Sequence, residues 1–267
     1  MSARLDQVDL VVAGLTDVGL RRTANEDAAL AERPVFLVAD GMGGYEAGDR
    51  ASAAVVAAFR AELVGRGAID ASWVGRALRR AEHDVAEIAA TTSRGAGSTV
   101  TGVVLLEHEG EPHWLIVNVG DSRVYRLFGA ELEQLTVDHS LAQALVDQGS
   151  LSGEERREFA HRNVITRAIG APDARADTWL MPVTTGERLL VCSDGLHGEL
   201  DDEQLRAMLT MAGRPESAAA ALVDAAKRAG GRDNITVLVV DVRAGGAAST
   251  SDRTDSVELS ASATIPI

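Results

Sequence analysis

Short apolar runs recur along this chain, and their order constrains the fold more than any other feature of the sequence. The runs are rich in Val, Ile and Leu and nearly continuous in hydrophobicity, which is typical of strands that are buried on both faces. Six runs stand out as strands: residues 10–15, 35–39, 99–106, 114–119, 189–192 and 235–240. Because only 3% of the residues are aromatic, aliphatic side chains have to fill the core.

Segments with helical periodicity lie between these runs and after them. Residues 71–90 carry apolar side chains at spacings of three and four, and residues 49–63 form a second helix beside them. The loop at residues 65–67 is short, so we expect the two helices to run antiparallel. Further helices are predicted at residues 140–147, 202–211 and 216–228. This order is not a regular βαβ alternation, and it predicts an α+β layered domain with mostly antiparallel sheets and helices packed outside.

The charge and the apolar content exclude several classes of partner. The formal net charge is −14, whereas nucleic-acid-binding proteins usually present a basic face, and an acidic chain is not attracted to anionic membranes. No apolar run reaches the length of a membrane span, and the N-terminus lacks the apolar core of a signal peptide. Cys192 is the only cysteine, so no internal disulfide can form. We therefore expect a cytoplasmic monomer that binds neither nucleic acid nor membrane.

The C-terminal segment differs in composition from the rest of the chain. Residues 244–267 contain eight Ser or Thr, few large apolar residues before Ile265, and no clear period. Such a segment cannot bury enough apolar surface to fold. We therefore predict one domain over residues 1–243, followed by a disordered Ser/Thr-rich tail over residues 244–267.

Aspartates follow three of the apolar runs and precede a fourth. Asp40, Asp121 and Asp194 come just after their runs, and Asp233 comes just before the last run. In an antiparallel sheet the end of one strand lies beside the start of its neighbour, so these four carboxylates can gather at one edge. Any one of them can simply begin a turn, since Asp favours turns. Four at strand ends beside Gly or Asn favour a shared site instead.

A turn at residues 32–34 would bring a fifth acid, Asp27, opposite Asp40. Glu26 is adjacent to Asp27, although its side chain starts on the other face. Crowded carboxylates repel one another unless a cation neutralises them, and carboxylate with water ligation suits Mg²⁺ or Mn²⁺. Gly41 and its neighbouring glycines leave room for backbone carbonyls to approach such a cation. Residues 120–123 are predicted to form a tight hairpin between two strands.

Seven short motifs occur along the chain in an order that is specific as a set, although each motif alone is weak. They are residues 22–27 (Arg-Thr-Ala-Asn-Glu-Asp), 39–44 (Ala-Asp-Gly-Met-Gly-Gly), 97–99 (Gly-Ser-Thr), 119–123 (Val-Gly-Asp-Ser-Arg), 135–140 (Leu-Thr-Val-Asp-His-Ser), 193–196 (Ser-Asp-Gly-Leu) and 232–236 (Arg-Asp-Asn-Ile-Thr). Together they resemble the metal-dependent protein phosphatases of the PPM class, also called protein phosphatase 2C, in their bacterial form. The resemblance extends from about Asp9 to Val242.

The resemblance implies a four-layer αββα sandwich, in which antiparallel helix pairs flank two antiparallel β-sheets. It also implies a binuclear metal centre in a cleft at one end of the sandwich. By motif, Asp40, Asp194 and Asp233 would ligate the first metal. Asp40 and the backbone carbonyl of Gly41 would hold the second.

The resemblance gives the remaining polar residues supporting roles. Glu26 and Asp27 would act on the second metal through bound water. Asp121 and Asp194 would hold a third, weaker metal. Arg22 would bind the phosphate of the substrate, and the planar fork of its guanidinium suits phosphate oxygens. The cofactors implied are therefore Mn²⁺ or Mg²⁺ at two tight sites and a third weaker one.

The activity that the resemblance implies is hydrolysis of phosphoserine and phosphothreonine in proteins by direct attack of a metal-bridging water. Two metals about 3.5–4 Å apart can lower the pKa of such a water and stabilise the attacking and leaving oxygens. Two alternatives remain: a phosphatase dedicated to one partner-switching regulator, and a catalytically inactive regulatory module of the same fold. All the expected acids are present, which argues against the inactive module.

Three positions depart from the family or stay open. Met42 stands where some eukaryotic members have a histidine assigned as general acid, so the proton donor is not identified. His139 lies in the Asp-His-Ser motif, where orienting a loop is favoured over catalysis. Residues 147–162 are polar and charged, and they form either a substrate-selecting flap beside the cleft or an ordinary solvated connection.

Overall fold

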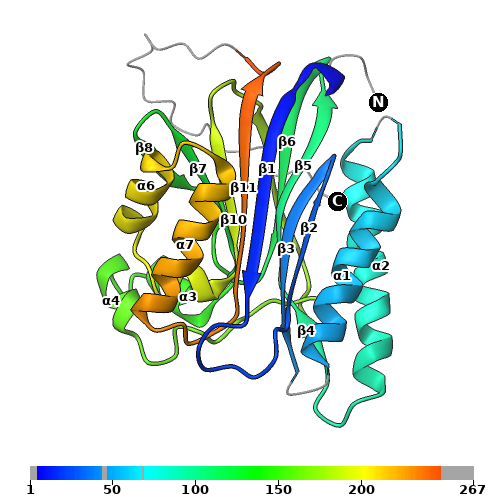
Figure 1. Ribbon diagram of the computed structural model, residues 1–267. Coiled ribbons are helices and arrows are strands. Elements are labelled where there is room, and N and C mark those ends of the chain that lie inside the picture. The colour runs from blue at the N-terminus through cyan, green and yellow to red at the C-terminus, as the bar shows by residue number, and fades with distance from the viewer. Residues whose placement is uncertain (1–4, 44–46, 68, 248–267) are drawn as a thin grey trace.

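Two antiparallel β-sheets lie face to face in this chain, and helices cover the outer face of each sheet (Figure 1). The structure is a computed structural model that describes residues 5–43, 47–67 and 69–247. The predicted α+β fold, a four-layer αββα sandwich, is confirmed. Among the described residues, no helix has both the length and the apolar character needed to cross a bilayer.

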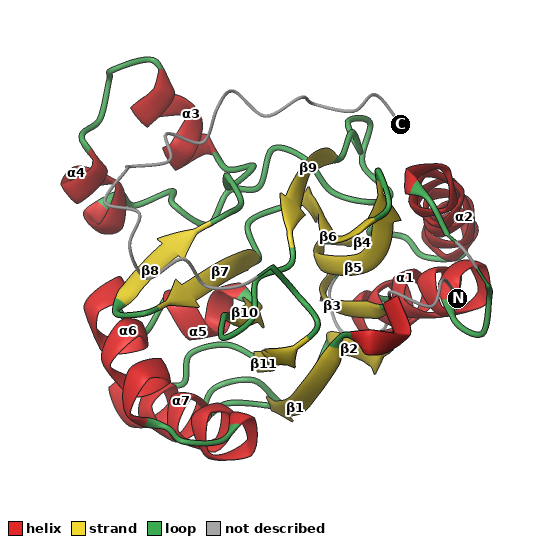
Figure 2. Ribbon diagram, turned by 90° about the horizontal axis from the view of Figure 1, so that it is seen from above, coloured by secondary structure: helices red, strands yellow, loops and turns green. Residues whose placement is uncertain are grey.

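The first sheet has the strand order β2-β3-β5-β6-β9, and the short β4 pairs with β3. Its strands are β2 (Asp27–Glu32), β3 (Val35–Met42), β4 (Gly97–Ser98), β5 (Val100–His108), β6 (Glu111–Val119) and β9 (Asp177–Pro182). The long helices α1 (Gly48–Leu63) and α2 (Ala71–Ala90) pack side by side over its outer face, as Figure 2 shows from above.

The second sheet has the strand order β1-β11-β10-β7-β8. Its strands are β1 (Asp9–Asp17), β7 (Arg123–Phe128), β8 (Glu131–Gln134), β10 (Arg188–Cys192) and β11 (Ile235–Ala244). Helices α6 (Asp202–Met211) and α7 (Pro215–Ala229) cover it, together with the single turn α5 (Asp194–His197). The remaining elements are the 3-10 turn Leu5–Gln7 and the helices α3 (Leu141–Asp147) and α4 (Gly153–Glu158), the two helices lying on the side of the sandwich where β8 runs.

The core has three layers, which explains why the strands read as continuous apolar runs. In β10, Leu189 packs between the two sheets, whereas its neighbour Leu190 packs against the helices of the second sheet. In β5, Val103 packs between the two sheets, and its neighbour Val104 packs against α1 and α2. Successive side chains of a strand point to opposite faces, so a strand inside such a stack needs an apolar residue at every position.

The helices begin and end close to the predicted positions because their capping residues are local signals. Asp70 accepts a hydrogen bond from the backbone N–H of Ser72 at the start of α2, at 2.9 Å. Asp201 and Gln204 form a capping box at the start of α6, and α7 ends at Gly230. Side chains that bond the free N–H groups of the first turn fix where a helix starts.

One local prediction is wrong: residues 120–123 do not form a hairpin. They connect β6, in the first sheet, to β7, in the second. The pairing of β6 explains this, because its two edges are already bonded to β5 and β9 and no edge is left for β7. Gly120 has a φ of +110°, which glycine adopts without strain, and a Cβ there would lie 2.5 Å from Thr99 Cγ2.

The start of the predicted tail also differs from the prediction. Ala244 is the last residue of β11 and pairs with Asp9. The N–H of Ala247 donates to the carbonyl of Val183 at 2.8 Å, and its carbonyl accepts from Thr185 at 3.0 Å. Residues 244–247 therefore pack on the domain, because Thr185 and Val183 offer free backbone groups there. The rest of the predicted tail, 248–267, lies outside the described residues.

Candidate active site

Two predicted acids of the first sheet face each other across a hairpin. Asp27 begins β2 and Asp40 lies near the end of β3, and the two are directly paired residues in the register of the strands. The predicted juxtaposition of Asp27 and Asp40 is confirmed. It follows from the turn after Glu32, because Glu32 pairs with Val35 and the register then continues without a shift to the acids.

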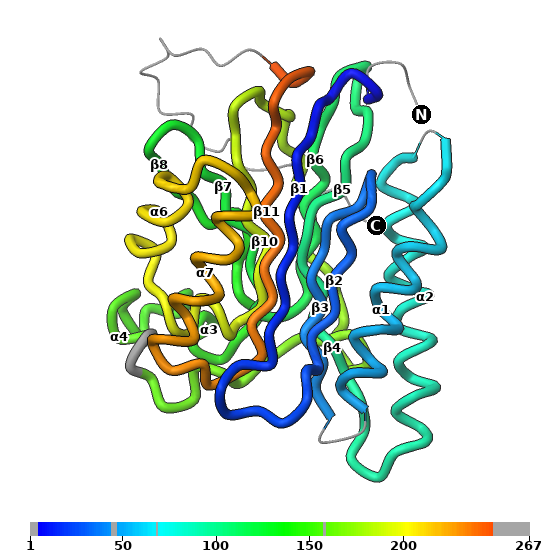
Figure 3. Tube along the Cα trace, in the orientation of Figure 1, coloured from blue at the N-terminus to red at the C-terminus, as the bar shows by residue number. Residues whose placement is uncertain are grey.

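The second sheet brings its acids to the same end of the sandwich. Asp194 lies two residues after the end of β10 and begins α5, and Asp233 lies just before β11, the neighbour of β10. Figure 3 shows this end at the bottom of the view, where β1 ends, β2 and β11 begin, and the β1–β2 connection closes the sandwich. Asp121 lies at the same end, in the link between the sheets, which is the connection of residues 120–122 between β6 and β7. The acids therefore gather at one end of the sandwich, as the resemblance implies, but they come from two facing sheets and not from one edge of a single sheet.

Apart from Asp233, which accepts a hydrogen bond from Arg22 at 2.7 Å, the aspartates gathered at this end form no ion pair with a basic side chain among the described residues. Burial, and then the charges of Asp27, Asp194 and Asp121, raise the pKa of Asp40 well above its usual value. Burial and the neighbouring acids also raise the pKa of Asp27 to about 7 and that of Asp194 to about 6. The pKa of Asp121 is raised by burial and by Asp194 and Asp138. Like charges at close range disfavour ionisation in this way.

Two carboxylate oxygens in this group are buried without a hydrogen-bond partner among the described residues, Asp27 Oδ1 and Asp121 Oδ1. The other oxygen of Asp27 accepts a hydrogen bond from Ser193 Oγ at 2.8 Å. Buried polar atoms are rarely left unpaired, and a site that binds a cation is one physical reason for an exception. Several hard oxygen donors with raised pKa values and free lone pairs are the ligand set that Mg²⁺ or Mn²⁺ prefers, so these residues fit a divalent cation.

Gly41 and Gly48 make a close backbone approach beside these acids. A Cβ on Gly41 would lie 2.0 Å from the carbonyl oxygen of Gly48, and a Cβ on Gly48 would lie 2.4 Å from Glu26 Oε1. The N–H of Gly41 donates to the carbonyl of Glu26 at 3.1 Å. Any other residue at either position would displace backbone or the Glu26 carboxylate, so the predicted role of Gly41 in keeping side chains away from the site has a physical basis.

Asn234 organises the site, although the sequence did not single it out. Its Oδ1 accepts a hydrogen bond from the N–H of Glu26 at 2.9 Å, and its Nδ2 donates to the carbonyls of Val18 and Ala24 at 3.0 and 2.9 Å. The chain segment before β2 is thereby fixed to the start of β11. The signal in the sequence was the Asp-Asn pair before an apolar run, but its partners are far away along the chain.

Arg22 lies at the solvent side of the acids. Its Nη2 donates to Asp233 Oδ2 at 2.7 Å, and its Nη1 lies 3.9 Å from Glu26 Oε2. The side chain is 48% exposed, so part of the guanidinium fork faces solvent. Burial lowers the pKa of Arg22, but the Asp233 hydrogen bond and the charges of Asp233 and Glu26 raise it further, so the net pKa lies above its usual value. The residue is placed to meet an anion that approaches the acids.

A cavity of about 470 Å³ opens beside the acids, and Asp121, Asp194 and Asp233 lie in its wall. Arg156 and Arg162, from the segment that was predicted to be a flap or a connection, line the same cavity. That segment therefore lies beside the site. The cavity is large enough to take more than a phosphate group and has both acidic and basic walls.

Two histidines contact the link that carries Asp121. His139 Nδ1 accepts a hydrogen bond from the N–H of Gly120 at 3.1 Å, which supports the loop-orienting role that the sequence favours. His197, which the sequence did not single out, lies with its Nε2 3.0 Å from the carbonyl oxygen of Asp121. Burial and the charge of Arg123 lower the pKa of His197 to about 3, so its ring is neutral near pH 7. Met42 pairs with Gly97 and has no proton to donate.

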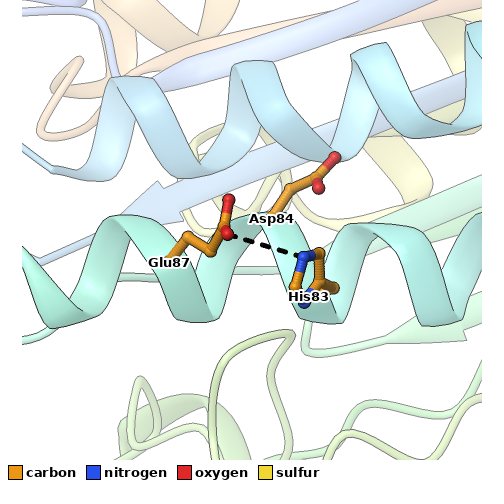
Figure 4. A group of neighbouring side chains, drawn as sticks. All are labelled: His83, Asp84 and Glu87. Atoms are coloured by element: carbon orange, nitrogen blue, oxygen red, sulfur yellow. Dashed lines mark ion pairs between the residues drawn. The ribbon is translucent and has the colours of Figure 1, made fainter.

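A different group of potential metal ligands lies on the outer helix α2. His83, Asp84 and Glu87 offer ligand atoms within 4.8 Å of one another, and among the described residues this is the tightest such group (Figure 4). The side chains of His83 and Glu87 are each 72% exposed and form an ion pair at 3.5 Å, and Asp84 lies 3.7 Å from Arg80. Solvent and these ion pairs satisfy the group, so it gives no indication of a bound cation.

Comparison with known proteins agrees with this geometry. The family model described as protein phosphatase 2C matches residues 21–226. The chain is 35% identical over 241 residues to the serine/threonine protein phosphatase PstP of Mycobacterium tuberculosis, a match that covers 86% of this chain and 44% of PstP. The chain thus spans less than half the length of that relative. It is 32% identical to the serine/threonine phosphatase stp of Listeria monocytogenes, covering 85% of this chain and 93% of that protein.

Solved structures give the same result. The crystal structure of the catalytic domain of the serine threonine protein phosphatase PstP in complex with two manganese ions aligns with a TM-score of 0.80 at 32% identity, covering 88% of this chain and 99% of that one. The ordered motifs, the two-sheet sandwich, the acids gathered at one end and these similarities lead to one conclusion. The chain belongs to the protein phosphatase 2C family.

Proposed function

We propose that this protein is a metal-dependent serine/threonine protein phosphatase. The observation that carries the proposal is the group of acids at one end of the sandwich, in which Asp27 and Asp121 each keep a buried oxygen without a partner among the described residues. Buried carboxylates of this kind are costly unless a cation pairs with them. The family supports a phosphatase, and the names of the relatives support serine and threonine as the phosphorylated residues.

The proposed ligands follow the motifs of the family. Asp40, Asp194 and Asp233 would hold the first cation, and Asp40 with the carbonyl of Gly41 would hold the second. The manganese ions in the PstP catalytic domain support two sites. Either Mn²⁺ or Mg²⁺ fits these oxygen ligands.

Three further acids complete the proposed centre. Glu26 and Asp27 would act on the second cation through water, and Asp121 and Asp194 would hold a third, weaker one. The raised pKa values of Asp27, Asp121 and Asp194 support this, because a cation would favour the charged forms that burial disfavours.

When bound, the two cations would act as Lewis acids and activate a water for in-line displacement at phosphorus. The chain's own residues bind and orient the substrate. The half-exposed fork of Arg22 would take two phosphate oxygens, and its bond to Asp233 would keep that fork aimed at the acids. No serine or cysteine is needed as a nucleophile, and burial raises the pKa of the Cys192 thiol to about 12, which keeps it unreactive.

The substrates proposed are phosphorylated proteins. Arg156 and Arg162 in the wall of the cavity can contact residues on either side of a phosphorylated side chain. The size of the cavity, about 470 Å³, also fits a peptide segment better than a lone phosphate.

The test is hydrolysis of phosphothreonine and phosphotyrosine peptides of the same sequence, with Mn²⁺, with Mg²⁺ and with chelator. We expect phosphate release from the phosphothreonine peptide with either metal, little from the phosphotyrosine peptide, and none with chelator. A matched preparation of Asp40→Asn excludes a contaminating phosphatase, since it should be inactive in all conditions. Metal-independent release, or equal release from Asp40→Asn, would refute the proposal.

A further inference from the structure

The backbone around Asp121 is held by two histidine rings from different elements. We infer that His197, supported by His139, is a positioning residue that fixes Asp121 for the third, weak cation site. The inference rests on the proposed function, because it assigns a task to a residue that supports a ligand of that site.

The first contact sets the proton position on His197. Its Nε2 lies 3.0 Å from the carbonyl oxygen of Asp121. A carbonyl oxygen only accepts, so Nε2 carries the hydrogen and donates it. That hydrogen is therefore committed to the backbone, which argues against His197 as the proton donor to a leaving group.

The second contact holds the preceding residue. The N–H of Gly120 donates to His139 Nδ1 at 3.1 Å, and the N–H of His139 donates to the carbonyl of Gly120 at 2.8 Å. Because His139 Nδ1 accepts, its Nε2 carries the hydrogen, and this atom lies 3.1 Å from Asp177 Oδ2. Arg167 Nη1 donates to the other oxygen of Asp177 at 2.9 Å, which keeps that carboxylate in place. Asp177 thus fixes the orientation of the His139 ring.

These contacts matter because of where they act along the link, which crosses between the sheets and belongs to no strand. Its neighbours are held by other bonds: Asn118 Nδ2 donates to the carbonyl of Gly120 at 3.2 Å, and Ser122 Oγ lies 2.9 Å from Thr99 Oγ1. Asp121 is only 5% exposed, yet its Oδ1 has no partner among the described residues. Its carboxylate is therefore positioned through its backbone, and His197 bonds the backbone oxygen of that same residue.

His197 also connects Asp121 to the other proposed ligand of the third cation. Asp194 begins α5 and His197 ends it, so the two residues are one helical turn apart. The bond from His197 to Asp121 therefore ties the link to the turn that carries Asp194. A displacement of either acid would change the spacing that a cation shared by both requires.

The experiment compares two substitutions of His197. His197→Gln keeps an N–H donor at a similar reach, whereas His197→Leu keeps the volume and removes the donor. His113→Leu is the matched control, because His113 Nδ1 also bonds a backbone carbonyl, that of Glu111 at 3.0 Å, in β6 at the end of the strand remote from Asp121. Asp121→Ala defines which binding event belongs to the third site. Calorimetric titration with Mn²⁺ and melting of the metal-free protein are measured for all five proteins, wild type included.

We expect His197→Leu to weaken only the weak Mn²⁺ event, by about ten- to hundredfold, as is usual when a group behind a metal ligand is removed. His197→Gln should stay close to the wild type, and His113→Leu should be unchanged. If His197→Leu does not fold, His197→Asn replaces it, because its amide is too short to reach the carbonyl, and the same weakening is expected.

Two results separate the inference from the proposed function. If Asp121→Ala removes the weak event but His197→Leu or His197→Asn leaves it unchanged, the inference is wrong and the proposed third site stands. If Asp121→Ala removes no event, the proposed third site is wrong and the inference falls with it. Equal weakening in the Gln and Leu variants would also overturn the inference, since the donor would then not be the feature that matters.

Discussion

Glu187 and Asp27 are both buried carboxylates at strand ends, but their surroundings differ completely. Glu187 accepts hydrogen bonds from Arg126 Nε at 2.6 Å, Trp114 Nε1 at 2.9 Å and the N–H of Thr184 at 2.9 Å. Asp27 has an unpartnered Oδ1, and its neighbours are other acids. Glu187 is therefore paired with a basic side chain of the protein itself, whereas Asp27 is not.

The difference does not come from a lack of arginine near the acids. Arg123 lies in the same cavity wall as Asp121, but it donates to both oxygens of Asp138, at 2.8 and 2.7 Å. Burial raises the pKa of Asp138, but the charge and hydrogen bonds of Arg123 lower it further, so the net pKa lies below its usual value. One buried acid at this end is paired and its neighbours are left for an external cation. Among the described residues, the two buried carboxylate oxygens without a hydrogen-bond partner, Asp27 Oδ1 and Asp121 Oδ1, both lie at this end.

The largest expected effect comes from neutralising an acid that the proposed function assigns to the tight cation sites. Asp40→Asn and Asp233→Asn should each lower kcat/KM on a phosphothreonine peptide by roughly a thousandfold or more, equivalent to about 4 kcal/mol of transition-state stabilisation. The fold should survive, because the amide removes repulsion among buried acids. Peptide hydrolysis with saturating Mn²⁺ and thermal melting measure the two effects. Full activity in either folded variant would show that these acids do not hold the catalytic cations.

The paired acid should behave in the opposite way. Glu187→Gln leaves the partly buried Arg126 beside a neutral group, and breaking an ion pair made by a fully buried acid costs about 3–5 kcal/mol. The free energy of unfolding should fall by that amount, while Mn²⁺ affinity and the turnover of the folded protein stay the same. Urea unfolding and calorimetry check both. A variant with weakened Mn²⁺ binding and unchanged stability would break the distinction between the two ends.

The pH dependence of the metal-free protein sharpens the comparison. A carboxyl whose pKa is higher in the folded state stabilises the fold below its unfolded pKa and loses that contribution as the pH rises through the folded value. The pKa of Asp27 rises from 3.8 to about 7, which corresponds to about 4 kcal/mol at about 1.4 kcal/mol per pH unit. With chelator present, Asp27→Asn should therefore become progressively more stable than the wild type as the pH rises from about 4 to about 7.

Melting curves of the two proteins at matched pH values measure that difference. The difference in stability between the two proteins is the quantity to follow. Other acids, such as Asp173 with its arginine partner, affect the pH dependence of stability equally in both proteins. Saturating Mn²⁺ should reverse the order by stabilising the ionised wild type. A constant difference across this range would mean that Asp27 is ionised in the folded metal-free protein.

The sequence was sufficient to predict the long helices, the most apolar strands and the pairing of Asp27 with Asp40, because these depend on local signals: helical periodicity, apolar runs, and a turn that sets the register of a hairpin. It did not indicate the less apolar strands β8 and β9 or the short helices α4 and α5. It was not sufficient to assign strands to sheets. A strand that is buried on both faces has no polar side to show which sheet it joins, and so residues 120–123 were assigned to a hairpin when they cross between sheets.

Long-range hydrogen bonds were the other limit. Asn234 and Glu26 are 208 positions apart, and no local pattern indicates that one fixes the other. His197 was missed for the same reason, since its partner Asp121 is 76 positions away. The site acids were recognisable because each lies at the end of a strand, whereas the residues that hold them are defined only by the fold.

The smallest expected effect concerns Arg22, the basic side chain that pairs with Asp233 in the proposed site. Its bond to Asp233 is half exposed, and exposed ion pairs contribute about 0.2–1 kcal/mol, so Arg22→Ala should hardly change the melting temperature. If its fork holds the substrate phosphate, kcat/KM should fall by roughly ten- to a hundredfold, or about 1.5–3 kcal/mol. The loss should appear mainly as a higher KM, with Mn²⁺ affinity little changed. Steady-state kinetics on a phosphothreonine peptide and calorimetry measure these quantities.

Two further variants decide how Arg22 acts. Arg22→Lys keeps the charge but loses the planar fork, so it should recover only part of the lost kcat/KM if two phosphate oxygens are held together. Arg175→Ala is the matched control, because Arg175 forms an exposed pair with Asp173 at 2.8 Å and does not line the cavity. Its kinetics should equal those of the wild type. If Arg22→Ala also behaves like the wild type, then Arg22 serves only to pair with Asp233, and it belongs with the scaffold ion pairs and not with the site.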